Sequence, residues 1–145
     1  MAKFPLDKVL DFRRHLRLEK RNALAKTLAD ERELVAHKER VERQRTVLLD
    51  ELTELAQAQD VDVPATARRR AFLGRLDIEV MILDDHIAQA RRRVEIARNE
   101  LVKADQEVKA LEKLKDKHIA EQNYVAARNT ERDLSEQWQA ANWNW

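Results

Sequence analysis

The chain has 145 residues, of which 38% are charged and 5% are aromatic, with one glycine, two prolines and no cysteine. So few turn-forming and aromatic residues exclude a compact domain with a thick core, and the absence of cysteine excludes a disulfide framework. The 28 basic and 27 acidic residues nearly cancel, which argues against a general nucleic-acid or membrane-surface binder. The abundant alanine, leucine, glutamate, arginine, lysine and glutamine favour long helices.

A first helix is predicted over residues 6–59, because Pro5 suits the start of a helix. Its seam, the line of residues that faces a partner helix, is apolar at Leu6, Leu10, Leu24, Leu28, Leu34, Val41, Leu48, Leu52 and Leu55. Charged residues occupy other seam positions, namely Arg13, Arg17, Lys20, Glu31, Lys38 and Arg45. This helix is therefore predicted to be the poorer strand of a coiled coil.

Residues 60–66 are predicted to form a turn, because Pro64 cannot continue a helix interior and pushes the preceding residue toward extended geometry. Thr66 is the expected N-cap of a second helix over residues 67–139. Gly74 lies inside that helix, and the sequence leaves open whether the helix bends there.

The second helix carries an unbroken seam with apolar spacings of three and four, sustained over about five heptads. The seam consists of Leu73, Leu76, Val80, Leu83, Ile87, Ala90, Val94, Ala97, Leu101, Ala104, Val108 and Leu111. Such a pattern is typical of a long helix packed lengthwise on another helix.

The predicted fold is all-α, with two long helices in an antiparallel coiled-coil hairpin that forms a single elongated domain over residues 1–145. Folding about residues 62 and 63 places Leu48 near residue 77 and Leu6 near residue 119. The second helix then extends about twenty residues beyond the first. From Ala120 onward we expect no intramolecular partner, and residues 140–145 are expected to form a tryptophan-containing tail.

The sequence contains no pattern typical of an enzyme. Ser135 is the only serine and Gly74 the only glycine, so neither a nucleophile elbow nor a glycine-rich phosphate loop is possible. The four histidines do not have the spacing of metal ligands. We therefore expect no catalytic residue, no cofactor and no metal.

Two apolar groups are candidates for partner contacts. Phe72, Ile78, Met81 and Ile82 fall outside the seam register, and Val47 on the first helix is expected to join them, either as a docking site or in local packing. Trp138, Trp143 and Trp145 lie near the end of the chain, where they suit a docking peptide or a tail that folds back. Two arginine triplets, 68–70 and 91–93, are interpreted as solvated flanks of the coiled coil.

Three segments resemble the FliJ family of flagellar export proteins and its type III secretion counterpart, the YscO family. The opening resembles the family start at Phe4, Leu6, Asp7, Val9 and Leu10. The start of the second helix matches at Phe72, Leu73 and Leu76, and the C-terminal signature matches over 111–118, at Tyr124 and over 130–136. The resemblance extends over the whole chain and implies a two-helix antiparallel coiled coil.

The resemblance also implies a function, that of a non-catalytic component of the flagellar or type III export apparatus. It would couple the hexameric export ATPase to the cytoplasmic part of the export-gate membrane protein and handle export chaperones. The residues implied for the ATPase side are Leu6, Leu10, Arg13, Arg17, Leu111, Leu114, Tyr124 and Leu134. Those implied for the gate side are Leu48, Leu52, Phe72, Leu76 and Met81.

The expected location is the cytoplasm, at the periphery of the membrane export apparatus, because the N-terminus lacks the apolar core of a signal peptide and no apolar run could span a bilayer. The expected chain is a monomer that binds no nucleic acid. An alternative is a generic coiled-coil scaffold that self-associates through its unpaired end and its tryptophans. A third reading, a nucleic-acid-binding rod that uses the arginine triplets, predicts affinity that falls steeply with salt.

Overall fold

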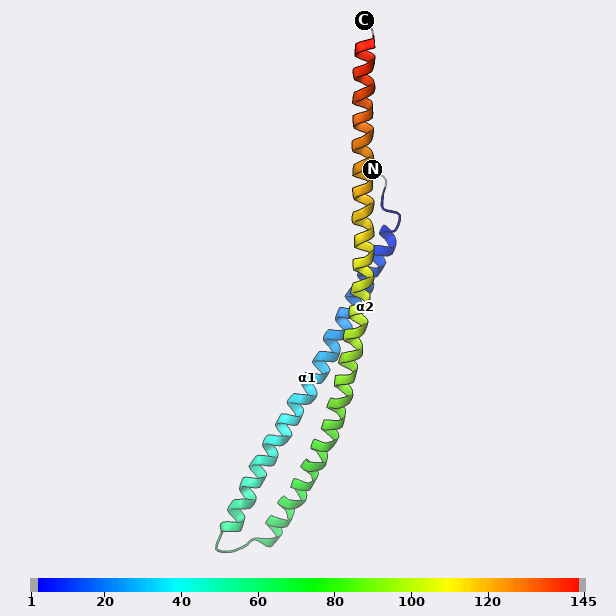
Figure 1. The fold of residues 1–145 in the computed structure, drawn as a ribbon. Coiled ribbons are helices and arrows are strands. Elements are labelled where there is room, and N and C mark those ends of the chain that lie inside the picture. Colours follow the sequence, from blue (N-terminus) through cyan, green and yellow to red (C-terminus); the bar gives the residue numbers. More distant parts are fainter. Residues whose placement is uncertain (1–2, 144–145) are drawn as a thin grey trace. The chain divides into compact units, whose positions relative to one another are not determined.

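The computed structural model describes residues 3–143 and contains two helices, α1 (Asp7–Gln57) and α2 (Val63–Trp143). Among the described residues there is no strand. The two helices pack against each other as an antiparallel hairpin, so the predicted all-α fold class is confirmed (Figure 1).

The chain divides into two units. The first, here called the hairpin unit, comprises residues 21–100 and contains the connection between α1 and α2. The second, here called the terminal unit, comprises residues 1–20 and 101–145. In the terminal unit the start of α1 lies beside α2, and α2 continues past it (Figure 1).

The connection between the helices spans residues 58–62, so the predicted turn over 60–66 is correct only at 60–62 and the predicted cap at Thr66 is wrong. Asp62 caps α2 instead, since its carboxylate accepts a hydrogen bond from the Ala65 amide at 3.1 Å. Pro64 lies within the first turn of α2, where its missing amide proton costs no helical hydrogen bond. Pro64, which was predicted to lie in the turn, is therefore part of the start of α2.

Helix α2 ends later than expected, because it continues to Trp143 rather than stopping near residue 139. Trp138 and Trp143 are therefore helical residues, and most of the predicted tail belongs to α2. Trp145 lies outside the described residues.

The seam of α2 is confirmed, because each of its twelve residues is buried or half-buried. In the hairpin unit the core joins Val41 and Leu48 of α1 to Leu76 and Leu83 of α2, and three half-buried residues pack against them: Leu34, Leu73 and Val80. In the terminal unit the two most deeply buried side chains are Leu10 and Val108, at 1% and 0% exposure. Burial of such side chains is the main favourable contribution to helix pairing.

The register of the hairpin differs from the prediction. Arg45 pairs with Asp77 in the hairpin unit, and Asp7 pairs with Lys115 in the terminal unit, so Leu48 does not lie level with residue 77 nor Leu6 with residue 119. In each of these pairs the two residue numbers add up to 122, so the chain folds back about residue 61, halfway between the paired residues. The shift follows from the earlier turn, because moving the reversal by one or two residues moves every facing pair by twice as much.

Helix α2 runs without interruption through Gly74, so the open question of a bend there is answered. A Cβ atom built on Gly74 would meet nothing within 4 Å. Glycine in an exposed helix interior costs about 0.5–1 kcal/mol relative to alanine, because it has more backbone freedom to lose on folding.

We therefore expect Gly74→Ala to stabilise the hairpin unit by about 0.5–1 kcal/mol, measured as a higher midpoint in thermal unfolding followed by circular dichroism. Ala71→Gly, on an exposed position one turn earlier, is the matched control and should lower the midpoint by a similar amount. A destabilising Gly74→Ala would show that the backbone at this position is not helical.

Candidate interaction surfaces

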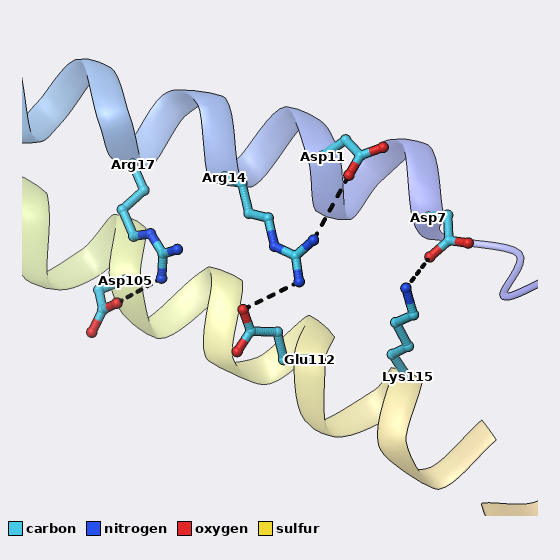
Figure 2. Close-up of polar contacts among 7 residues, drawn as sticks. All are labelled: Asp7, Asp11, Arg14, Arg17, Asp105, Glu112 and Lys115. Carbon is cyan, nitrogen blue, oxygen red and sulfur yellow. Dashed lines mark hydrogen bonds and ion pairs between the residues drawn. The ribbon is translucent and has the colours of Figure 1, made fainter. Parts of the chain in front are cut away.

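Ion pairs join α1 to α2 along the terminal unit, as Figure 2 shows. Lys115 lies 3.1 Å from Asp7, and Arg17 lies 3.1 Å from Asp105. Arg14 bridges two carboxylates, that of Asp11 on its own helix and that of Glu112 on α2 (Figure 2). The basic start of α1 is thus partly neutralised by the helix beside it.

These ion pairs change what the candidate ATPase-side residues can do. Arg13 lies 2.6 Å from Glu107, and Arg17 is held by Asp105, so both guanidinium groups already have partners within the unit. Leu10 is buried and Leu111 is half-buried between the helices. These four residues hold α1 against α2, and a partner protein would reach other side chains first.

The remaining candidates of that set are exposed. Leu6 and Leu114 are accessible beside the paired helices, while Tyr124 and Leu134 lie farther along α2. Every described residue from Ile119 to Trp143 is exposed, and the ring contact, ion pair and side-chain hydrogen bond of this segment each join two of its own residues. The expectation of an unpaired end of α2 is therefore confirmed; the segment 119–143 is called the exposed end below.

The exposed end carries large apolar side chains as well as charges. Trp138 and Trp143 are 69% and 87% exposed, and the ring of Tyr124 lies under the guanidinium of Arg128 at 5.9 Å. Exposed aromatic residues in such number on one helix are typical of a surface that is covered by a partner.

Asp105 is the centre of a small charge network in the terminal unit. Lys109 lies 2.9 Å from one of its oxygens and Arg17 3.1 Å from the other. The contact with Lys109 and then that with Arg17 lower the pKa of the Asp105 carboxyl below its ordinary value of 3.8. The ionised carboxylate therefore stabilises the folded unit.

Because the folded-state pKa of Asp105 is depressed, its contribution is fully present above pH 3.8 and is lost as the pH falls through the lower, folded value. We expect Asp105→Asn to lower the thermal midpoint by a few degrees at most at neutral pH, since Asp105 is only half-buried and water screens its attraction to Lys109 and Arg17. This difference from the unmodified chain should vanish under strongly acidic conditions. A difference that stays constant across the titration would show that the carboxylate is not held ionised by Lys109 and Arg17.

The hairpin unit has a second series of cross-helix pairs at seam positions of α1. Glu31, Lys38 and Arg45 lie seven residues apart and reach Arg91, Asp84 and Asp77 at 3.2, 2.6 and 2.6 Å. The contact with Asp84 raises the pKa of the Lys38 ammonium above its ordinary value of 10.5. The charged seam residues for which α1 was predicted to be the poorer strand are therefore paired with residues of α2 that flank its seam.

A groove lies between α1 and α2 in the hairpin unit, with a volume of about 720 Å³. Val47, Leu48 and Phe72 give it apolar walls. The polar side chains that line it are Arg40, Arg43, Gln44, Glu51, Arg68 and Arg69. We call this surface the arginine groove.

The candidate gate-side residues are divided by the structure. Leu48 and Leu76 are buried in the core of the hairpin unit, and Leu52 is half-buried. Phe72 and Met81 are exposed, and of the five only Leu48 and Phe72 line the arginine groove. Ile78 and Ile82 are also exposed, as their positions outside the seam register predicted.

Arg40 and Arg43 were missed by sequence reasoning as site residues, and Arg68 was read as a solvated flank. The signal that could have found them is the spacing of Arg40, Arg43 and Val47, which places all three on one side of α1. The spacing indicates a site only once the register is known, because the register brings Phe72 to the same side of the hairpin.

Within residues 3–143 no group of three or more histidine, cysteine or acidic side chains could hold a metal ion. No helix in this part of the chain is long and apolar enough to cross a membrane.

Comparison with known proteins gives two matches. A family model described as the flagellar FliJ protein matches residues 2–142. Among solved structures, that of a protein described as a YscO homologue from Chlamydia trachomatis is similar, with 22% identity, a TM-score of 0.51 and coverage of 98% of this chain and 96% of the other. This structural similarity supports the two-helix fold. A search among curated proteins finds no match.

Proposed function

Because this chain belongs to the FliJ family and is a component of the flagellar or type III export apparatus, we propose that it couples the export ATPase to the export gate. It would do so without an active site of its own, by binding both partners. It would reside in the cytoplasm, at the periphery of the membrane export apparatus, as a monomer. The handling of export chaperones is part of the same proposal.

The single observation that carries the proposal is the family match over residues 2–142. Two features of the surface support it. The exposed end offers Tyr124, Leu134 and Trp138 with no partner helix beside them, which suits insertion into a hexameric ATPase. The hairpin unit offers the gate exposed apolar residues of its own, Phe72 in the arginine groove and Met81 outside it.

The arrangement explains how a protein without catalytic residues could act. A helix pair held by a continuous apolar seam and by cross-helix ion pairs resists shear between its strands. We propose that a force or rotation received at one surface is passed on along α2, which is one helix from Val63 to Trp143. The paired arginines Arg13 and Arg17 would contribute by holding α1 on α2 near the ATPase, rather than by touching it.

Site-specific photo-crosslinking tests this assignment. A photoreactive phenylalanine analogue at Leu134 is expected to capture the export ATPase, and one at Met81 the cytoplasmic part of the gate protein. Ile96 is the control, because it is equally exposed in the hairpin unit but lies outside both surfaces. Capture of a second copy of the chain at both positions would instead support the alternative, a self-associating coiled-coil scaffold.

A further inference from the structure

The arginine groove has an unbalanced charge that distinguishes it from the rest of the helix interface. Four arginines line it and only one carboxylate, that of Glu51, which lies 3.0 Å from Arg69. Arg69 also donates to the Ala65 carbonyl oxygen. Its charge is therefore already neutralised within the unit.

The other three arginines of the groove, Arg40, Arg43 and Arg68, form no hydrogen bond or ion pair within the described part of the chain. This contrasts with Arg45 and Arg91 of the same unit, each of which is paired across the helices. In a chain whose basic and acidic residues nearly cancel, three unpaired cations around one groove form a local positive site.

The same groove is apolar along its walls. Val47 is 57% exposed and Phe72 is 46% exposed, one from each helix, with the buried Leu48 beside them. Leaving such side chains in water is unfavourable, by about 25 cal/mol per Å² of apolar surface that a partner could cover. A ligand for this groove must therefore supply apolar side chains and negative charge together.

An amphipathic helix with acidic flanks meets both requirements. A third helix fits naturally between two paired helices, where its apolar residues at spacings of three and four contact the groove walls. Its carboxylates would then lie within reach of the guanidinium groups, which bind carboxylates in a bidentate manner. Single-stranded nucleic acid fits less well, because it requires several stacking aromatic side chains and Phe72 is the single aromatic residue of the groove.

We propose that the arginine groove binds an acidic amphipathic helix of a partner protein, with Val47 and Phe72 receiving its apolar residues and Arg40, Arg43 and Arg68 its carboxylates. This inference rests on the proposed function in one respect, that the groove belongs to the surface assigned to the gate. It adds the chemistry of the ligand, which the proposed function leaves unspecified.

The test uses the full chain and a synthetic fluorescent helix with leucine and phenylalanine anchors and glutamate flanks, followed by fluorescence anisotropy. A second helix with the same anchors and lysine flanks is the matched probe. We expect the acidic helix to bind and the basic one to bind at least tenfold more weakly, and the affinity for the acidic helix to fall as salt is added.

Variants assign the binding to the groove. Arg43→Glu is expected to weaken it about tenfold, and Val47→Asp by a similar factor, since a charge-assisted contact or a buried anchor contributes about 1.5 kcal/mol. Arg92→Glu removes an exposed arginine of the same unit outside the groove and should leave the affinity unchanged. Circular dichroism checks that each variant folds, which the exposure of Arg43 and Val47 predicts.

Three results of these binding measurements would overturn the inference. The first is equal binding of the acidic and basic helices, and the second is an Arg43→Glu variant that binds as well as the unmodified chain. The third is binding of a single-stranded oligonucleotide that exceeds that of the acidic helix and depends on Arg43 and not on Phe72. Because no ATPase takes part, a failure here leaves the proposed coupling function standing, and a failure of ATPase stimulation leaves the groove result standing.

The same variants also distinguish binding of a second copy of the chain in the arginine groove. The exposed end contains Glu131, Asp133 and Glu136 beside Leu134 and Trp138, so it could compete for the groove. Self-association that Arg43→Glu abolishes would assign the groove to the chain itself and would contradict a partner protein as its ligand.

Discussion

Val108→Asp is expected to separate the two helices of the terminal unit, whereas Val102→Asp should leave them paired. Val108 has no solvent exposure, so the variant buries a carboxylate with no partner, at a cost of about 3 kcal/mol or more. Val102 lies on the same helix with 53% of its surface exposed, and the same replacement there should cost about 0.5 kcal/mol. Helix propensity is equally affected in both variants.

Thermal unfolding by circular dichroism measures the difference, and amide hydrogen exchange locates it. In Val108→Asp the amides of the first turns of α1, which lie in the terminal unit, are expected to exchange faster. If both variants melted alike, Val108 would not be part of the packed seam and the register described for the terminal unit would be incorrect.

Truncation after His118 is expected to leave the paired helices folded and to abolish binding to the export ATPase. The removed segment is exposed throughout its described residues, and its ring contact, ion pair and side-chain hydrogen bond each join two residues of the segment itself. Its loss should therefore shift the thermal midpoint by only a few degrees. The aromatic and apolar side chains that it carries, Tyr124, Leu134 and Trp138 among them, are the ones proposed to contact the ATPase.

Affinity for the ATPase, measured by sedimentation or calorimetry, decides the outcome of this truncation. Phe12→Ser is the matched control, because Phe12 is an exposed aromatic residue on α1 outside the removed segment and should leave binding intact. A truncated chain that melts far below the full chain would mean that the exposed end packs on the paired helices. Unchanged affinity would move the ATPase contact elsewhere.

The seam of α2 could be predicted residue by residue, because a period of three and four over so long a stretch has one structural solution. The predicted exposure of Phe72 and Met81 followed from the same pattern. The start of α2 could not be predicted, since the sequence of the connection allows both Asp62 and Thr66 as caps. The observed hydrogen bond from Ala65 to Asp62 selects the first of these.

The charged seam positions of α1 show why a small error in the turn matters. Lys38 pairs with Asp84, and Arg45 pairs with Asp77, only in a register in which the numbers of two facing residues add up to 122. A shift of three residues, which is the difference between the predicted and the observed register, would put different side chains opposite these cations. For the same reason the three unpaired arginines of the groove could not be distinguished from paired ones before the register was known.

If this hairpin couples an ATPase to an export gate, the hydrolysis rate of the cognate export ATPase should change as the ratio of this chain to the ATPase is increased. We expect stimulation at low ratio and its loss when residues 1–26 are removed, because these residues include the part of α1 that is held on α2 in the terminal unit. An unchanged rate, together with a stable oligomer in light scattering, would contradict the coupling function and favour the scaffold.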